Sequence, residues 1–302
     1  KKLNKQIIEN KINIVHIRSR APAWILKFIK NKSFKSVSTF HNIYGMENYF
    51  KKYYNNQLSK VDYITAISKY VKSEIAINYN INPNKITVIK RGIDTDFFNS
   101  KINESDLLDF ISKYNISLDK KIILFPGRLT EWKGQISFLN VIESIKDKNI
   151  ICYFVGDDKN KSYTSRLIKE INKKRINENC KIIGNLNMHN LKMMYLCSNI
   201  IVSAPLKPEG FGRIISEGLA MKKIVLSYNF GGAYEQIINL DDLFKVTPNN
   251  QEEMKNKIMK ALTLSKNSIE NLGILSRDHI IKNFSKNTML SSYLNFYNKV
   301  AK

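Results

Sequence analysis

Short apolar runs alternate along the chain with longer segments whose apolar residues recur at helical spacing. The runs are at 12–17, 37–41, 61–65, 85–89, 121–125, 149–155, 180–183, 199–204, 224–227 and 243–246. Such runs, bounded by polar residues, are typical of buried strands. Helical segments such as 135–145 and 162–174 fill the gaps, and the tail at 252–302 has helical character throughout. The alternation predicts an α/β protein with mostly parallel sheets and helices on both faces.

The runs form two series, separated by a stretch without strand character. This stretch lies between Ile93 and Asp119 and holds a turn, Arg91-Gly92-Ile93-Asp94, and a polar helix at 104–114. We therefore predict two Rossmann-like domains. The predicted parts are a first domain at 1–95, a linker at 96–118, a second domain at 119–280 and a final helix at 281–302. The first series has only four runs, so we expect an incomplete sheet and further residues before Lys1 in the natural protein.

Composition changes this picture little. The 302 residues carry a formal charge of +23, but the lysines are spread over the whole length. A diffuse excess without a basic tract is typical of lysines on solvated faces and argues against a nucleic-acid binder. If the charge has a function, an anionic membrane surface is the partner that we expect. No apolar stretch is long enough to span a membrane. The three cysteines have no C-x-x-C spacing, which favours free thiols in a reducing cytosol.

The strongest chemical signal is the segment 208–218, Pro-Glu-Gly-Phe-Gly-Arg-Ile-Ile-Ser-Glu-Gly, between a strand and a helix. Gly210 and Gly212 let the backbone approach a ligand closely. Glu209 precedes the helix and Glu217 lies on its first turns. Their carboxylates can accept hydrogen bonds from the hydroxyls of two different parts of one ligand.

A second segment, 125–135, also leads from a strand into a helix. Gly127 and Gly134 free its backbone, and Arg128 and Lys133 add two cations at a helix N-terminus. This combination suits a diphosphate, and we expect both cationic side chains to be solvated. The segment is no Walker loop, because G-x-x-x-x-G-K-[ST] does not occur. The turn Gly156-Asp157-Asp158 comes nearest to a D-x-D metal motif, but no second carboxylate cluster completes it.

Together these residues resemble glycosyltransferase family 4, a retaining family with the GT-B fold. The resemblance lies in Glu209 and Glu217 as the E-x7-E motif, in Gly127-Arg128 with Lys133-Gly134, in Arg91-Gly92-Ile93-Asp94 with Phe97, and in Gly231-Gly232 with Glu235. The run at 16–24 resembles a subgroup of bacterial surface-polysaccharide and lipopolysaccharide enzymes. The family's first glycine-rich loop is missing from the sequence.

The resemblance implies two parallel sheets that face each other across a cleft, with a final helix that crosses back to the first domain. It assigns catalysis to Glu209 and His41, where Glu209 holds the transferred sugar. The implied donor site consists of Gly127, Arg128, Lys133, Gly210, Phe211, Gly212 and Glu217, with the cations on the diphosphate and Glu217 on the ribose. Arg18, Ser19 and Arg20 are implied on the acceptor side.

The expected function is transfer of a sugar from a nucleotide diphosphate donor to a glycan or lipid-linked acceptor, with retention of configuration and without a metal or other cofactor. We expect a cytoplasmic hexosyltransferase, peripheral at the inner face of the plasma membrane, in lipopolysaccharide or surface-polysaccharide synthesis. Two alternatives stay open at this point. One is a nucleotide-sugar epimerase of the same architecture, and the remoter one is a basic nucleic-acid-binding protein.

Overall fold

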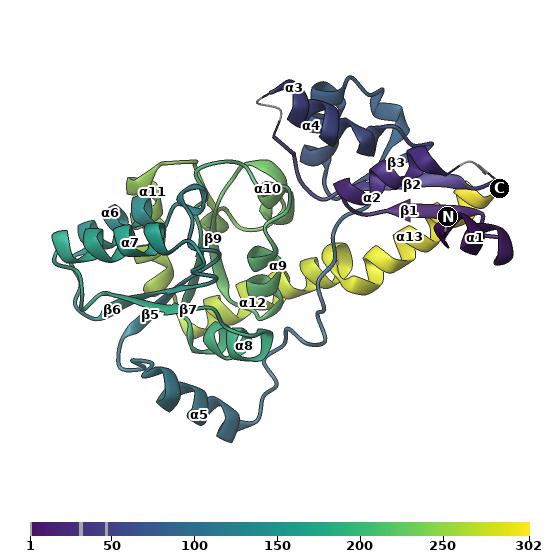
Figure 1. The fold of residues 1–302 in the computed structure, drawn as a ribbon. Helices are drawn as coiled ribbons and strands as arrows, with labels where there is room; N and C mark the ends of the chain where they lie inside the picture. Colours follow the sequence, from purple (N-terminus) through teal and green to yellow (C-terminus); the bar gives the residue numbers. More distant parts are fainter. Residues whose placement is uncertain (1, 30–32, 46–47) are drawn as a thin grey trace. The chain divides into compact units, whose positions relative to one another are not determined.

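A computed structural model describes residues 2–29, 33–45 and 48–302 (Figure 1). The chain forms two compact units, which we describe separately. The first unit is Lys1–Gly92 together with Asn283–Lys302, and the second is Ile93–Lys282. Every apolar run predicted as a strand overlaps a strand of the structure. The cleft between two facing sheets stays a prediction.

The first unit holds a parallel sheet of four strands, in the order β1-β2-β3-β4. The strands are β1 (Ile14–Ile17), β2 (Lys35–Phe40), β3 (Tyr63–Ala66) and β4 (Ile86–Val88). Helical segments connect them, as parallel pairing requires. These are α1 (Lys2–Glu9), α2 (Arg20–Ile25), η1 (Leu26–Phe28), α3 (Tyr49–Asn55), η2 (Asn56–Ser59), α4 (Lys69–Tyr79) and η3 (Pro83–Lys85).

The last helix, α13 (Lys286–Ala301), belongs to the first unit, although the whole second unit separates it from β4 in the sequence. Its buried residues Tyr293, Phe296 and Val300 form one apolar cluster with Val37 and Ile89 of the first sheet. The apolar stripe of α13 therefore completes the core on this face of the sheet.

A polar contact adds to this packing. Both ring nitrogens of His16, on β1, are within hydrogen-bond distance of a hydroxyl. Nδ1 lies 2.6 Å from the hydroxyl of Tyr297 on α13, and Nε2 lies 2.7 Å from Oγ1 of Thr39 on β2. The contacts tie the helix to two strands at once.

The second unit holds a parallel sheet in the order β10-β9-β8-β5-β6-β7. The strands are β5 (Lys121–Pro126), β6 (Ile150–Val155), β7 (Cys180–Gly184), β8 (Ile200–Ser203), β9 (Ile224–Tyr228) and β10 (Lys245–Val246). The helical segments are α5 (Glu104–Tyr114), η4 (Glu131–Lys133), α6 (Gln135–Ile145), α7 (Lys161–Lys173), α8 (Met188–Cys197), α9 (Arg213–Ala220), α10 (Gly231–Ile237), η5 (Asp242–Phe244), α11 (Gln251–Leu262) and α12 (Lys266–Phe284).

The chain direction across this sheet reverses between β5 and β8. From β5 the chain proceeds to β6 and β7 on one side, and it then returns to β8 and continues to β9 and β10 on the other. Open α/β sheets bind their ligands at such a switch point, outside the carboxyl ends of the strands. The topology thus selects the segments after β5 and β8, which are the two segments with the glycines and charges.

The stretch 96–118, predicted as a linker, groups with the second compact unit. The ring of Phe98 is almost fully buried, with its centroid 6.1 Å from that of Tyr195. Arg277 on α12 donates to the backbone oxygen of Phe98 at 2.9 Å. Helix α5 buries Phe110, and Asn190 on α8 donates to the hydroxyl of Tyr114 at 3.2 Å. Because most residues of this stretch are polar, the sequence pattern does not reveal that Phe98 and Phe110 are buried.

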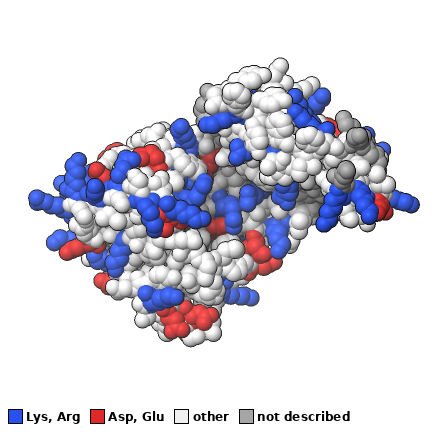
Figure 2. Space-filling model, viewed as in Figure 1, with Lys and Arg blue, Asp and Glu red and all other residues white. Residues whose placement is uncertain are grey.

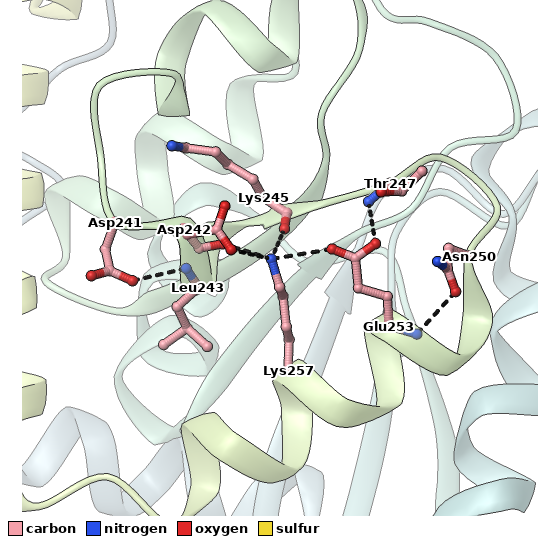
Figure 3. A network of polar contacts seen from close by, with 8 residues as sticks. All are labelled: Asp241, Asp242, Leu243, Lys245, Thr247, Asn250, Glu253 and Lys257. Atoms are coloured by element: carbon pink, nitrogen blue, oxygen red, sulfur yellow. Dashed lines mark hydrogen bonds and ion pairs between the residues drawn. The ribbon is translucent and has the colours of Figure 1, made fainter.

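A network of polar contacts joins η5 and β10 to α11 (Figure 3). The ammonium group of Lys257 donates to Oδ2 of Asp242 at 3.0 Å and to the backbone oxygen of Lys245, and it lies 3.2 Å from Oε1 of Glu253. Glu253 in turn accepts from the backbone N–H of Thr247 at 2.9 Å. The network fixes the edge of the sheet next to β9.

Basic side chains are scattered over the face in Figure 2, with acidic and uncharged residues between them. The view agrees with the diffuse charge of the sequence. Across 2–29, 33–45 and 48–302, the structure contains no helix long and apolar enough to cross a membrane. Cys152 and Cys180 are buried free thiols, and Cys197 is a half-buried one.

Candidate functional site

The segment after β5 turns sharply into α6 by way of Gly134. This glycine has a φ of +82°, and a Cβ atom there would lie 2.2 Å from the backbone oxygen of Ala204, just beyond β8. Only glycine tolerates both the conformation and the approach. The segments after β5 and β8 therefore touch at the switch point.

The central contact of the site is between Lys133 and Glu209. The ammonium group of Lys133 donates to Oε1 of Glu209, and the two side chains are only 14% and 8% exposed. The Lys133 chain also passes over Gly127 and places its ammonium 4.5 Å from the ring centroid of Trp132. The expectation that Lys133 is solvated is wrong, because its carboxylate partner and the indole ring cover it.

The second cation of the segment, Arg128, is exposed, as expected. Its guanidinium carbon lies 5.9 Å from the centroid of the Trp132 ring. In the part of the chain that the structure describes, Arg128 has no carboxylate partner. Its backbone oxygen accepts a hydrogen bond from Gln135 at 2.9 Å, so the backbone is held while the charge stays available.

The loop at 208–212 is held in place by α10. The backbone N–H of Gly232 donates to the oxygen of Glu209 at 2.8 Å. The side-chain amide of Gln236 donates to the backbone oxygen of Phe211, and its oxygen accepts from Ser216. Gly210 and Gly212 are buried, and the ring of Phe211 is turned into the core. Hydrogen bonds from α10 therefore hold the backbone of this loop at Glu209 and Phe211.

Glu217, on α9, is buried and held at both carboxylate oxygens. Arg213, one turn earlier, lies 2.8 Å from Oε1. The hydroxyl of Tyr195 on α8 donates to Oε2 at 3.0 Å. Burial, together with the Glu217 charge, raises the pKa of Tyr195 well above its usual value, so the hydroxyl stays a donor. A buried carboxylate fixed in this way is a rigid acceptor for ligand hydroxyls.

Two protein-family models match the sequence and assign the chain to a family. The model for glycosyl transferases group 1 matches residues 108–279, and the model for glycosyltransferase family 4 matches residues 1–97. The chain belongs to the group 1 glycosyltransferases. The first match covers nearly the whole second unit, including both segments at the switch point.

Individual relatives agree with this assignment. The crystal structure of a glycosyltransferase from Rickettsia africae is 36% identical, with a TM-score of 0.89, and the match covers 99% of this chain and 80% of that one. An uncharacterised glycosyltransferase of Methanocaldococcus jannaschii is 27% identical over 86% of this chain and 69% of its own length. A trehalose synthase of Thermococcus litoralis is 23% identical over 82% and 60%.

More distant solved structures bear on the fold alone. Anabaena HepE, whose structure is in complex with UDP and glucose, is 16% identical, with a TM-score of 0.83 over 98% of this chain and 81% of that one. The two parallel sheets of this group 1 glycosyltransferase thus have the GT-B fold. Relative to the curated relatives named above, the chain spans about two thirds of their length.

In the first unit of this glycosyltransferase, His41 follows β2 and lines a pocket of about 120 Å³ together with Arg18 and Arg91. The pocket lies where the carboxyl ends of β1 to β4 meet α13. Burial, and then the charges of Arg18 and Arg91, lower the pKa of His41 to about 4. Its Nδ1 is buried without a hydrogen-bond partner among the described residues. His41 is therefore a neutral imidazole at physiological pH.

The structure separates the three residues predicted on the acceptor side. Arg18 is close to His41, with its guanidinium carbon 5.9 Å from the ring centroid of Tyr293. Ser19 precedes α2 as its N-cap. Arg20 turns away toward α3, where it donates to Oδ1 of Asn55 at 3.1 Å. Arg18 thus shares a pocket with the predicted catalytic histidine, and Arg20 lines a different one.

Three residues that hold Glu217 and the loop at 208–212 in the second unit are not among the predicted site residues. Arg213 pairs with Glu217 at the i,i+4 spacing of a helix, a signal that is present in the sequence. Tyr195 and Gln236 reach the site from other helices, 22 residues from Glu217 and 25 from Phe211. Only the fold brings them there.

The described residues contain no group of three or more His, Cys, Asp or Glu side chains that could hold a metal ion. In the Gly156-Asp157-Asp158 turn, Oδ2 of Asp158 lies 2.6 Å from the ammonium of Lys161. The backbone oxygen of Asp157 accepts from Leu129 at 2.9 Å. The turn therefore supports the segment after β5.

Proposed function

We propose that this group 1 glycosyltransferase transfers a hexose from a nucleoside diphosphate donor to a glycan or lipid-linked acceptor, with retention of the anomeric configuration. The observation that carries the proposal is the Lys133–Glu209 pair at the switch point of the second sheet, with the exposed Arg128 beside it. A cation and a carboxylate in contact can engage a diphosphate and the sugar attached to it at the same time.

The proposed donor site uses the residues in distinct roles. Arg128 and Lys133 bind the diphosphate, and the N–H groups at the start of α6 add to them. The fixed carboxylate of Glu217 accepts hydrogen bonds from the ribose hydroxyls. Gly127, Gly210 and Gly212 let the donor approach the backbone, and the buried ring of Phe211 holds the loop.

Chemically, the two cations stabilise the charge that grows on the leaving diphosphate as the glycosidic bond breaks. This role is the reason that we propose transfer without a metal. Glu209 holds the transferred sugar. His41, a neutral imidazole at the end of β2, supplies a hydrogen-bonding group from the first unit, and Arg18 contacts the acceptor.

For the biological setting we propose lipopolysaccharide or surface-polysaccharide synthesis at the inner face of the plasma membrane. The support is the subgroup resemblance at 16–24 and the large positive charge. A relative at 22% identity is named as a phosphatidylinositol N-acetylglucosaminyltransferase subunit of Saccharomyces cerevisiae, and a phosphatidylinositol is a lipid. A lipid-linked acceptor fits this setting.

A thermal-shift screen of UDP, GDP and ADP tests the donor site. A bound nucleotide at about 100 times its dissociation constant stabilises the protein by about 2.7 kcal/mol. If one of the three nucleotides raises the melting temperature, the result supports the proposal. If no nucleotide raises it, the result contradicts the proposal. The matching nucleotide sugar is then incubated with and without acceptor lipids. Conversion of the donor to its epimer without an acceptor would favour the epimerase instead.

A further inference from the structure

Three short segments of the first unit expose large apolar side chains. These segments are α2, η1 and α3, and we call them together the aromatic–basic surface. Phe28 on η1 is 79% exposed, and Tyr49 and Phe50 on α3 are 76% and 81% exposed. Ile25, Tyr53 and Tyr54 are exposed by smaller fractions. Apolar side chains grouped in this way mark an interaction surface.

Contacts between the aromatic rings make this surface one structure. The indole of Trp24 on α2 stacks on the ring of Tyr54 with a centroid distance of 5.8 Å, and its N–H donates to the backbone oxygen of Tyr54 at 3.3 Å. Trp24 also lies edge-on to Tyr53, and Tyr53 stacks on Tyr49. The exposed rings therefore stand on a common support rather than on independent loops.

The charges within the surface have one sign. The helical segments read Arg-Ala-Pro-Ala-Trp-Ile, Leu-Lys-Phe and Tyr-Phe-Lys-Lys-Tyr-Tyr-Asn, and they contain no acidic residue. The ammonium of Lys27 lies 4.3 Å from the ring centroid of Trp24. Lys51 and Lys52 are exposed next to Phe50. The cations thus lie on the same helical segments as the exposed rings.

A pocket of about 410 Å³ opens beside the exposed rings. Among the described residues it is lined by Arg20, Gly45, Phe50, Lys51, Tyr54 and Asn55, of which none is acidic. The guanidinium of Arg20 is fixed there, since it donates to Asn55 and its carbon lies 4.6 Å from the ring centroid of Tyr44. A fixed guanidinium next to a lysine is the chemistry that recognises a phosphate.

We infer that the aromatic–basic surface docks on a bilayer that contains anionic lipids, with a lipid phosphate in the Arg20–Lys51 pocket and Phe28 and Phe50 in the acyl region. Tyr and Trp favour the level of the headgroups, where their polar ends stay hydrated. Lysines beside them are attracted by the negative surface potential. A protein partner could also cover the rings, but it would need acidic side chains opposite all of the basic ones. The Arg20–Lys51 pocket favours a phosphate over such a partner. The inference deepens the proposed function, because it brings the enzyme to a lipid-linked acceptor.

Co-sedimentation with vesicles tests the surface directly. The full chain is mixed with vesicles of phosphatidylcholine alone or of phosphatidylcholine with phosphatidylglycerol, and we expect binding that depends on the anionic lipid and weakens with salt. Lys51→Gln should lower the vesicle affinity about fivefold. Phe50→Ser should lower it about tenfold, since it removes one anchoring ring. Both side chains are exposed, so neither change should alter the melting temperature.

Matched controls come from the second unit. Leu108→Ser removes an exposed apolar side chain from α5, and Lys173→Gln removes an exposed charge from α7; neither should change vesicle binding. Excess inorganic phosphate, added at constant ionic strength, separates a free phosphate site from a bilayer site, because it should not release the protein. Absence of binding to anionic vesicles, or equal losses in the controls, would overturn the inference. Nucleotide affinity should be unchanged in all four variants. A failure of the membrane inference can therefore be distinguished from a failure of the proposed donor site.

Discussion

The ammonium group of Lys133 donates a hydrogen bond to the carboxylate of Glu209, and this pair links the segment after β5 to the loop after β8. The contact crosses the switch point of the second sheet. A diphosphate that binds there competes with Glu209 for Lys133, whereas Arg128 has no such competitor among the described carboxylates. The two cations of the proposed donor site should therefore behave differently when they are removed.

We predict that Arg128→Ala and Lys133→Ala each weaken nucleoside diphosphate binding by about one to two powers of ten, the loss of one charge-assisted hydrogen bond. Only Lys133→Ala should also lower the free energy of unfolding, by roughly 1–3 kcal/mol, because Glu209 is left without its partner. Calorimetric titration and urea unfolding measure the two effects. Lys173→Ala, on the exposed face of α7, should change neither. Equal stability losses in both variants would contradict the buried pair.

Tyr195→Phe tests how Glu217 is held. The change removes one hydroxyl from a fully buried ring and leaves Oε2 of Glu217 without this donor. We expect a stability loss of roughly 1–3 kcal/mol and a severalfold weaker nucleotide affinity, because the carboxylate is free to turn. Urea unfolding and calorimetric titration measure these. If the affinity falls and the stability does not, Tyr195 touches the ligand instead.

The two half-buried histidines of the first unit, His16 and His41, should make its stability depend on pH. Burial, and then the charge of Arg18, lower the pKa of His16 to about 4, and His41 behaves similarly. Because the folded pKa lies below the ordinary value of 6.5, the unfolded chain binds protons more readily. The stabilisation is complete above pH 6.5 and is lost as the pH falls toward 4.

Urea unfolding across that window measures the loss, and His16→Asn should make it smaller without abolishing it, since His41 still titrates. A profile in which His16→Asn and the unchanged protein lose the same free energy would show that His16 is not desolvated.

The packing of α13 on the first sheet can be measured on two residues of one helix. Phe296 is almost buried in the cluster with Val37 and Ile89, and Leu294 is 63% exposed. Phe296→Ala should cost roughly 3–5 kcal/mol of stability, and Leu294→Ala less than about 0.5 kcal/mol. Urea unfolding followed by far-UV circular dichroism compares them. Similar losses of stability in both variants would contradict the packing of this face of α13 on the first sheet.

Strands could be predicted well from the sequence because parallel strands buried on both faces read as continuous apolar runs. Even the bounds of α5 and α6 agree with the pattern at 104–114 and 135–145. At 96–118 the pattern favours a linker, because Phe98 and Phe110 are isolated among polar residues. Local pattern does not reveal that a distant helix buries them.

Candidate site residues could be proposed from the sequence where glycines and charges follow a strand, as with Lys133 and Glu209. Their mutual contact was not, since the two residues are 76 positions apart in the sequence. The burial of Lys133 follows from that contact, so it was missed as well. The supports from Tyr195 and Gln236 depend in the same way on how the helices pack. Sequence patterns indicate the groups, and the fold decides their partners.

Glu209→Gln separates donor binding from transfer. Glutamine has nearly the same shape as glutamate, and its side-chain oxygen can still accept from Lys133, so the loop should keep its structure. The substitution removes the negative charge that competes with the diphosphate for Lys133. Nucleoside diphosphate affinity should therefore stay the same or rise by up to about fivefold, if the competing pair contributes about 1 kcal/mol.

Transfer should respond in the opposite direction. If Glu209 holds the sugar through a charged carboxylate, the neutral amide loses stabilisation of the positive charge that develops at the anomeric carbon, and kcat should fall by about 10²-fold or more. Glu217→Gln is the matched comparison, because the same change one helix turn beyond Arg213 should weaken nucleotide binding instead. Calorimetry with the nucleotide and a transfer assay with its sugar give both quantities for each variant. If Glu209→Gln loses affinity and kcat together in the manner of Lys133→Ala, then Glu209 serves to position the lysine, and the sugar is held by another group.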